Sequence, residues 1–462
     1  MPYRVSDSLI DSNRSYPHVN DRRDDRSIYV GRRPEADMQI RAHALSSPID
    51  PPQERRFHGG VRRLLKRDAV IAVIEAPDGE RGYVPAGASS SAMREFFEGD
   101  SHQAFAELLE GRVADALDGI TFDGIESIER AHDALDDLDL PPKLGAEAAA
   151  AIDVALYDLL GKRQGAPVHE LLGDDSAPTM DLDLYASAGM YMEPEGYAAQ
   201  AKTLDDCGFV GYKYRPGIGP AEDRRIVEEV TDVVSSEMDV MVDAHTWWKT
   251  GGDVYDTEAV CELVAHADDN GAFWIEEPVA PDNHEAYVSL AEATGAPLAG
   301  GESEPTPEEL LSLARTEGVS FLQGDVRHHA GYTGCWGAVE FCHDAEADVR
   351  YVPHHFGTLL GLVANSHLVA AAGGTLLEYP VFEDDPALDT DDTDDPGMYP
   401  FSLAFDVLDD DLDIDDGRLS VPDGPGLGVD LNLDVVKSYP YIEGPWTEFV
   451  YDEQRLRSSY RS

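Results

Sequence analysis

The pattern of apolar and polar positions changes along the chain at about residue 180. Before it, β-rich apolar runs are separated by the turn pair Asp78-Gly79, which is typical of a hairpin. Residues 92–135 then carry helical periodicity, and the alanine-rich stretch 145–165 predicts a long helix ended by a glycine and a proline. We therefore expect an α+β domain over residues 36–178.

After residue 180, short apolar runs alternate with helical stretches. This alternation predicts parallel strands joined by crossover helices, and eight such strands close a barrel. We assign the barrel to residues 179–382, so the expected fold class is α/β. The runs lie near 182–187, 209–215, 239–245, 272–277, 297–302, 319–325, 349–354 and 374–378.

Two terminal segments fall outside this pattern. Residues 1–35 are polar and aperiodic and predict an extension. Residues 383–462 begin with an acidic, loop-like stretch and continue with turns and short strands, which we expect to pack back on the N-terminal domain.

Acidic residues far outnumber basic ones. The chain has 91 Asp and Glu against 35 Lys and Arg, a net charge of −56 over 462 residues. A surface of this sign repels nucleic acid, so we expect no nucleic-acid partner. Because regular apolar runs separate the acids, we interpret them as the surface of a halophilic protein, since screening shortens electrostatic repulsion to about 3 Å in 1 M salt. An acidic protein adapted to ordinary salt is the alternative.

The remaining composition predicts a cytoplasmic, enzyme-sized protein. No apolar run is long enough for a transmembrane helix, so we expect no membrane partner. The N-terminal residues lack the apolar core of a signal peptide. Four cysteines, none in a C-x-x-C pair, make no disulfide framework.

Charged or titratable residues follow the predicted barrel strands at their C-terminal ends, where active sites of such barrels lie. A structural strand end more often carries a small or apolar residue, so this series points to a catalytic site. The residues are Lys213 and Arg215, Asp243 and His245, Glu276, Glu302, Asp325, His354, and Glu378.

Three of these residues predict a metal site. Asp243, Glu276 and Glu302 come from three consecutive strands, and converging carboxylates repel one another unless a cation joins them. Hard oxygen ligands suit Mg²⁺, whereas Zn²⁺ favours His and Cys. Glu277 is the alternative to Glu276, but the two-residue period of a strand sends the pair to opposite sides, and we assign the metal to Glu276.

Several motifs together resemble the enolase superfamily, in its mandelate racemase-like branch. They are WIEEPV (274–279), GGES (300–303), GD (324–325), PHH (353–355) and DGPGLGV (423–429), and the helix 151–174 is also similar. The resemblance covers roughly residues 55–435. It implies an α+β capping domain, a modified (β/α)7β barrel, a required Mg²⁺ and a homo-oligomer.

The resemblance also implies the reaction type, which is removal of a proton next to a carboxylate. Such a carbon acid is too weak for a side-chain base unless nearby positive charge stabilises the enediolate. His354 with Asp325 resembles the family's His–Asp dyad, in which the carboxylate orients the imidazole and raises its basicity. His355 is the alternative to His354.

Two positions distinguish the possible reactions within this branch. Racemases carry Lys-x-Lys at the second barrel strand, but this chain has Lys213-Tyr214-Arg215. Arginine stays protonated and is a poor base, so we expect Lys213 and Arg215 to hold the substrate carboxylate or a hydroxyl. Asp243-x-His245 resembles the sugar-acid dehydratases, where the His is the general acid for the departing 3-hydroxyl.

Further residues are expected to contact substrate or shape its cavity. In the family pattern Glu378 bonds the substrate carboxylate, and His328 resembles a substrate contact of galactonate dehydratase. Trp247 and Trp248 start an insertion that either walls the site or packs beneath a loop. The His58-Gly59-Gly60 turn (58–60) is a candidate specificity loop.

We therefore expect a Mg²⁺-dependent dehydratase (a hydro-lyase) acting on a small-molecule sugar acid, which it converts to a 2-keto-3-deoxy acid. Three alternatives remain. One is an epimerase or racemase of hydroxy or amino acids on the same fold, and another is a catalytically inactive homologue with a binding or regulatory role. The third is a muconate-type cycloisomerase, but such sites are expected to use paired lysines.

Overall fold

The computed structural model describes most of the chain between residues 38 and 451. The expected N-terminal extension and most of the acidic stretch after residue 383 lie outside the described residues. The described ranges are 38–87, 97, 102–173, 178–249, 255–344, 347–383, 385 and 398–451.

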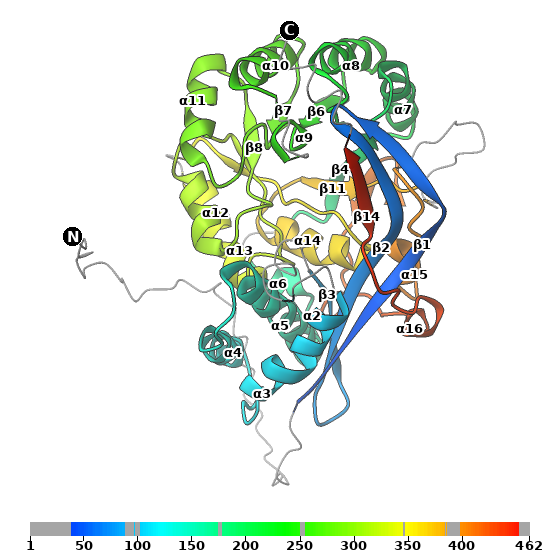
Figure 1. Cartoon of the computed structure of the whole chain (residues 1–462). Coiled ribbons are helices and arrows are strands. Elements are labelled where there is room, and N and C mark those ends of the chain that lie inside the picture. The colour runs from blue at the N-terminus through cyan, green and yellow to red at the C-terminus, as the bar shows by residue number, and fades with distance from the viewer. Residues whose placement is uncertain are drawn as a thin grey trace, which may run out of the picture.

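The N-terminal unit is an antiparallel sheet beside a group of helices (Figure 1). β1 and β2 form a long hairpin, and β3 adds to β2. The expected helix over 145–165 is confirmed: it begins at Pro142, where proline suits the first turn, and ends at Gly165, whose φ of 70° allows a left-handed cap. The elements are β1 (Gln39–Phe57), β2 (Gly60–Glu75), β3 (Arg81–Ala86), α2 (His102–Leu108), η1 (Leu109–Val113), α3 (Ala114–Ala116), α4 (Glu126–Asp136), α5 (Pro142–Gln164) and α6 (Val168–Leu172).

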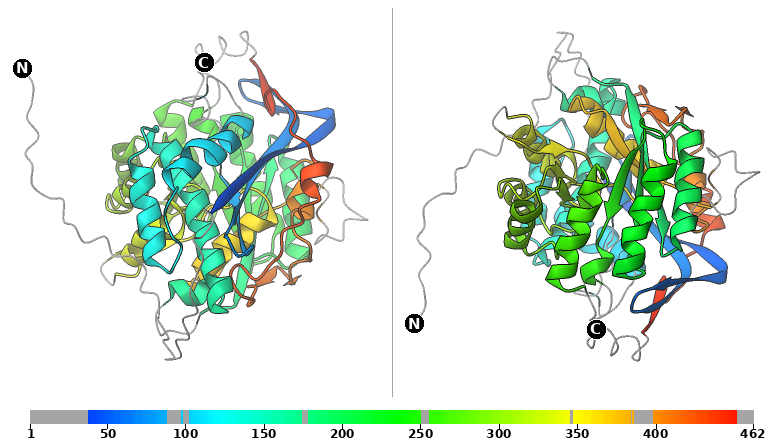
Figure 2. Two further views of the ribbon diagram at one scale, coloured as in Figure 1. Left: turned by 90° about the horizontal axis from the view of Figure 1, so that it is seen from below. Right: turned by 90° about the horizontal axis from the view of Figure 1, so that it is seen from above.

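The second unit is the predicted barrel of parallel strands. Each of the eight predicted apolar runs overlaps a strand, and parallel pairing runs from β11 through β4 to β10. At least one helix stands between each strand and the next (Figure 2). The strands are β4 (Asp181–Met190), β5 (Gly211–Arg215), β6 (Asp239–Asp243), β7 (Trp274–Glu276), β8 (Leu298–Gly300), β9 (Phe321–Leu322), β10 (Arg350–Tyr351) and β11 (Leu376–Pro380). The helices are α7 (Pro194–Asp206), α8 (Pro220–Val233), α9 (Thr246–Lys249), α10 (Thr257–Asp269), α11 (His284–Thr294), α12 (Pro307–Ala314), α13 (Gly331–Cys342) and α14 (Leu359–Ala371).

The C-terminal segment touches both units. β13 pairs with β4 of the barrel, and β14 then pairs antiparallel with β2, with Thr447 opposite Leu64. Its elements are α15 (Leu403–Asp406), β12 (Ile414–Asp415), β13 (Arg418–Ser420), α16 (Val435–Ser438) and β14 (Thr447–Tyr451).

Buried residues hold the two units in a fixed relation. The core of the N-terminal unit continues into α13 and α14 of the barrel. Asp153 of α5 is fully buried and accepts the backbone N–H of Tyr332 at 2.6 Å, at the start of α13. The barrel interior is filled by aromatic rings, with Trp274 and Phe321 centred 4.9 Å apart. This packing sets the N-terminal unit over the barrel. No helix in the described ranges has the length and apolarity needed to span a bilayer.

A buried histidine pair where α6 meets α14 leads to a stability prediction. The Nε2 of His367 donates to the carbonyl of Leu427, and its Nδ1 accepts the backbone N–H of His169. Burial lowers the pKa of His367 to about 3, helped by its His169 neighbour. In the unfolded chain this residue takes up a proton near pH 6.5.

We expect His367 to make the fold labile to acid. Because the unfolded chain binds more protons than the native state between about pH 6.5 and 3, the free energy of unfolding falls as pH falls, by at most about 1.4 kcal/mol per unit from this residue. Denaturant titration in molar KCl at pH 7, 6 and 5 measures the slope. His367→Asn should flatten the slope, whereas His266→Asn, on the half-buried surface of α10, should not. An unchanged slope in His367→Asn would contradict the assignment.

Candidate active site

The strand-end residues come together at the C-terminal edge of the barrel. β6 and β7 are in register, so that Asp243 lies opposite Glu276. Glu302 follows β8, Asp325 follows β9 and His354 follows β10. Because parallel strands end at the same edge, residues distant in sequence become neighbours there.

A buried lysine joins two of the carboxylates. The Nζ of Lys213, which is 0% exposed, lies 2.8 Å from Glu276 Oε1 and 2.8 Å from Glu378 Oε1. Burial opposes the charged lysine, but the two carboxylates outweigh it and raise its pKa. Burial and the nearby carboxylates of Asp243 and Glu378 raise the pKa of Glu276 even with Lys213 beside it. The carboxylates of this cluster therefore outnumber the one lysine that neutralises them.

Asp243 is held by two basic side chains. The Nε of Arg215 lies 2.9 Å from its Oδ2, and the Nδ1 of His245 lies 2.6 Å from its Oδ1. Burial alone would raise the pKa of Asp243, but His245 and Arg215 reverse this and hold it below its usual range. Asp243 is thus a permanent carboxylate that orients both side chains.

His354 bridges two carboxylates. Its Nδ1 lies 3.1 Å from Asp325 Oδ2 and its Nε2 lies 2.8 Å from Glu302 Oε2. Burial disfavours the imidazolium, but Glu302 and the hydrogen bond to Asp325 outweigh it and raise the pKa of His354 to about 10. The Nε of Arg327 lies 3.0 Å from Asp325 Oδ1 and helps to keep Asp325 ionised against the effect of burial. His354 is protonated at neutral pH in this arrangement.

The contacts of His354 differ from those of His355, and the contacts of Glu276 differ from those of Glu277. The ring of His355 contacts neither Asp325 nor Glu302 through a hydrogen bond, and its pKa is lowered by burial and by Arg327. Its backbone N–H donates to Glu378 instead. Glu276 faces Lys213, whereas Glu277 follows the strand with a left-handed φ of 42°.

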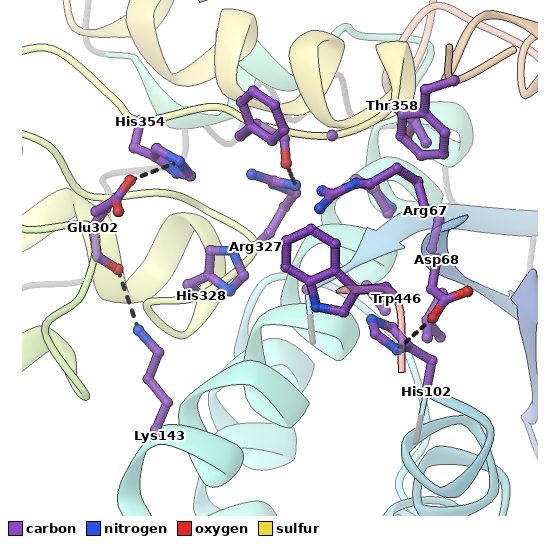
Figure 3. A pocket seen from close by; sticks show the side chains of 18 of the residues that line it. Arg67, Asp68, His102, Lys143, Glu302, Arg327, His328, His354, Thr358 and Trp446 are labelled. Carbon is purple, nitrogen blue, oxygen red and sulfur yellow. Dashed lines mark hydrogen bonds and ion pairs between the residues drawn. The ribbon is translucent and has the colours of Figure 1, made fainter. Parts of the chain in front are cut away.

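A cavity of about 280 Å³ lies between the N-terminal unit and this barrel edge (Figure 3). Its size is near the lower end of the roughly 300–1,000 Å³ typical of small-molecule sites. Glu302 and His354 form one side of it, with His328 nearby. The Nδ1 of His328 lies 3.3 Å from the buried carboxylate of Glu147 on α5.

The other predicted site residues lie outside the lining of this cavity. Lys213, Arg215, Asp243, His245, Glu276, Asp325 and Glu378 are not among its wall residues. Two contacts connect them to the wall: Asp325 bonds His354, and the Cζ of Arg215 lies 4.9 Å from the ring centre of the wall residue Phe356.

Two expectations about the surrounding loops have clear outcomes. Trp247 is 2% exposed and donates its indole N–H to Asp223 of α8 at 3.0 Å, so it is buried in packing and does not wall the cavity. The backbone N–H of His58, at the β1–β2 turn, bonds the carbonyl of Gly217 at 2.7 Å, and His58 does not line the cavity.

Sequence reasoning missed three polar residues of the site. Gln323 donates to Glu276 at 2.7 Å, Arg327 pairs with Asp325, and the Nζ of Lys143 donates to the carbonyls of Glu302 and Glu304. Lysine is scarce in this chain, so a lysine at the start of a buried helix was itself a usable signal for Lys143. Arg327 and Gln323 carried no comparable sequence signal.

The chemistry of the carboxylates fits a hard divalent cation. Asp243, Glu276 and Glu302 supply oxygen donors only, from consecutive strands, and the neighbouring negative charges raise the pKa of Glu276. Within the described part of the chain, no three His, Cys, Asp or Glu side chains already converge as a ligand set. Each of the three carboxylates instead contacts a basic side chain. Glu276 contacts Lys213, Asp243 contacts Arg215, and Glu302 contacts His354.

Family models match both units of the fold. Residues 54–173 match the N-terminal domain of the mandelate racemase / muconate lactonizing enzymes, and residues 196–435 match the enolase C-terminal domain-like family. The chain belongs to the enolase superfamily, in the mandelate racemase / muconate lactonizing enzyme family. It is an enzyme fold with a capping domain over an α/β barrel.

Individual relatives carry out different reactions. The chain is 27% identical to the D-galactarolactone cycloisomerase of Agrobacterium fabrum, over 87% of this chain and 97% of that protein. It is 26% identical to the D-xylonate dehydratase of Haloferax volcanii, over 66% of this chain and 72% of that protein. A crystal structure of an enolase superfamily member from Polaromonas superposes with a TM-score of 0.71 at 25% identity, covering 89% of this chain and 99% of the other.

Proposed function

We propose that this protein is a Mg²⁺-dependent sugar-acid dehydratase that converts an aldonate to a 2-keto-3-deoxy acid. The observation that carries the proposal is the Asp325–His354 contact at the cavity wall, with His354 Nδ1 3.1 Å from the carboxylate. A histidine held by a buried carboxylate is a typical general base. Relatives that act on sugar acids support the substrate class.

The proton balance assigns a role to each residue. His354 takes the C2 proton of the aldonate, and the substrate becomes an enediolate. His245 gives a proton to the 3-hydroxyl, which leaves as water, and the resulting enol tautomerises to the ketone. Asp325 orients His354, and Asp243 orients His245 through its 2.6 Å contact.

His354 accepts a proton only after it releases the one that Glu302 now stabilises at Nε2. Asp243, Glu276 and Glu302 would hold the metal. When bound, Mg²⁺ supplies positive charge beside the substrate carboxylate and an alternative partner for these three carboxylates. Lys213 lies 2.8 Å from Glu378 as well as from Glu276, so it would keep one carboxylate partner if Glu276 held the metal.

Elimination is favoured over racemisation by Arg215. A racemase needs a second base on the opposite face of the substrate, and the arginine at this position pairs with Asp243 at 2.9 Å, which holds its proton still more firmly. Arg215 therefore serves as a fixed cation.

A screen of five- and six-carbon aldonates tests the proposal. It is run in molar KCl with Mg²⁺, because salt screens the self-repulsion of a chain of net charge −56, and it detects the 2-keto-3-deoxy product. Product from one or two acids that disappears with excess EDTA and returns with Mg²⁺ supports the dehydratase. C2 deuterium exchange without keto product would replace elimination by epimerisation.

His245→Asn separates elimination from proton abstraction. We expect keto-acid formation to fall by roughly 10²–10⁴-fold, because hydroxide is a poor leaving group without a general acid, while C2 deuterium exchange persists. NMR in D₂O follows both signals in one sample. Equal loss of exchange and elimination would contradict the acid role, and the exposed His343→Asn serves as the control.

A further inference from the structure

Three arginines and two aromatic rings form an alternating stack between the capping domain and the barrel. The Cζ of Arg62 lies 4.6 Å from the ring centre of Trp446, and the Cζ of Arg67 lies 4.7 Å from the same ring. The Cζ atoms of Arg67 and Arg215 lie 5.4 Å and 4.9 Å from the ring centre of Phe356. Contacts in this range are cation–π interactions, which hold each guanidinium in a defined plane.

The stack carries more positive charge than its surroundings neutralise. Arg215 pairs with Asp243, but no acidic side chain among the described residues pairs with Arg62 or Arg67, and the buried Nε of Arg67 donates no hydrogen bond there. Burial and the charges of Arg67 and Arg215 lower the pKa of Arg62. In a chain of net charge −56, an excess of cations at one partly buried point is unusual.

Of the three arginines in the stack, Arg67 is the one that lines the cavity, together with the rings of Phe356 and Trp446. It extends from β2 toward Arg327 of the barrel, on the side away from Glu302 and His354 (Figure 3). Asp68, the next residue, is bound to Lys66 at 2.9 Å and does not compensate Arg67. Arg327 already pairs with Asp325, so Arg67 is the guanidinium at this wall that has no carboxylate partner among the described residues.

We propose that Arg67 is the recognition residue for a second carboxylate, so that among sugar acids the dehydratase prefers a di-acid over the aldonate of the same stereochemistry. This inference rests on the proposed function, since it places C2 of the substrate at His354 and its far end at Arg67. A terminal hydroxyl leaves the Arg67 charge uncompensated, whereas a carboxylate accepts two parallel N–H bonds from one guanidinium. Trp446 and Phe356 act as positioning residues that keep the guanidinium plane fixed.

The test compares hexarates with hexonates of the same stereochemistry, in molar KCl with Mg²⁺. We expect wild-type kcat/KM to be at least about tenfold higher for one hexarate than for the matching hexonate. Arg67→Gln should lower the hexarate-to-hexonate ratio by about 10- to 100-fold, chiefly through KM. Arg67→Lys, which keeps the charge but not the planar fork, should lower the ratio less. Arg63→Gln, on the same strand and paired with Glu448 at 3.1 Å, is the matched control and should leave it unchanged.

Calorimetric binding to the His354→Asn protein separates this inference from the proposed function. In one outcome the wild type turns over neither acid, but the hexarate binds more tightly than the hexonate and loses that advantage in His354→Asn/Arg67→Gln. That result supports the anion subsite and contradicts the dehydratase activity. If the hexonate is turned over and an Arg67 substitution changes kcat/KM equally for both acids, the result contradicts the subsite and supports the dehydratase activity. Tighter, Arg67-dependent binding of a 6-phosphohexonate than of the hexarate would overturn the di-acid in favour of a phosphate ester. A melting temperature within a few degrees of wild type confirms that each variant is folded.

Discussion

Replacement of His354 by asparagine is expected to lower kcat by roughly 10²–10⁴-fold and to abolish C2 deuterium exchange. Asparagine keeps a hydrogen-bonding group beside Asp325 and Glu302, with which His354 makes contacts of 3.1 and 2.8 Å, but it cannot take up a proton. The loss is therefore chemical. Measuring exchange and keto-acid formation in the same D₂O sample distinguishes proton abstraction from every later step.

Two further variants serve as comparisons for His354→Asn. Asp325→Asn should retain binding but lower kcat, because the amide no longer holds the imidazole as the carboxylate does. His343→Asn, exposed at the end of α13, should behave as wild type. Retention of more than about a tenth of the exchange rate in His354→Asn would remove this residue from the role of base and direct attention to His328, which also lines the cavity.

Replacement of Lys213 by methionine is expected to destabilise the fold by about 3–5 kcal/mol. Methionine fills a similar volume, so packing changes little, but Glu276 and Glu378 lose the cation that lies 2.8 Å from each. Both carboxylates are almost fully buried, and an uncompensated buried charge has a large desolvation energy. Denaturant titration in molar KCl with excess EDTA measures the effect without added divalent cation.

The double variant Lys213→Met/Glu378→Gln should recover part of the loss, because it removes one of the two unbalanced charges. Lys202→Met is the control. Lys202 pairs with Asp206 on the exposed face of α7 at 3.1 Å, and such surface pairs contribute about 0–1 kcal/mol. A Lys213→Met protein less than about 1 kcal/mol weaker than wild type would show that the cluster is not held by this ion pair.

The neighbouring glutamates show how far local sequence rules reach into the site. A two-residue period separates Glu276 from Glu277 in any strand. It does not state which of them faces Lys213, because that depends on the register between β6 and β7, which places Asp243 opposite Glu276. The histidine pair is similar, since the contact of His354 with Asp325 joins loops after two different strands.

The position of Arg67 could not be predicted from local sequence rules at all. It belongs to no sequence motif, and its four aromatic neighbours come from the loop after β10 and from the C-terminal segment. They are Phe356, Tyr399, Phe401 and Trp446, all within 5.8 Å of its Cζ. No periodicity in β2 anticipates such an environment.

The sequence by itself determined the elements and the chemistry available at the strand ends. Apolar alternation specifies eight barrel strands, and the polar residue after each strand must lie at the edge where parallel strands end. These are local properties of the chain. The tertiary structure decided which carboxylate each cation neutralises, which side chains reach the cavity, and that Arg67 faces it from the capping domain. The physical reason is that electrostatic energy depends on distances between segments far apart in sequence, and only the packed fold sets those distances.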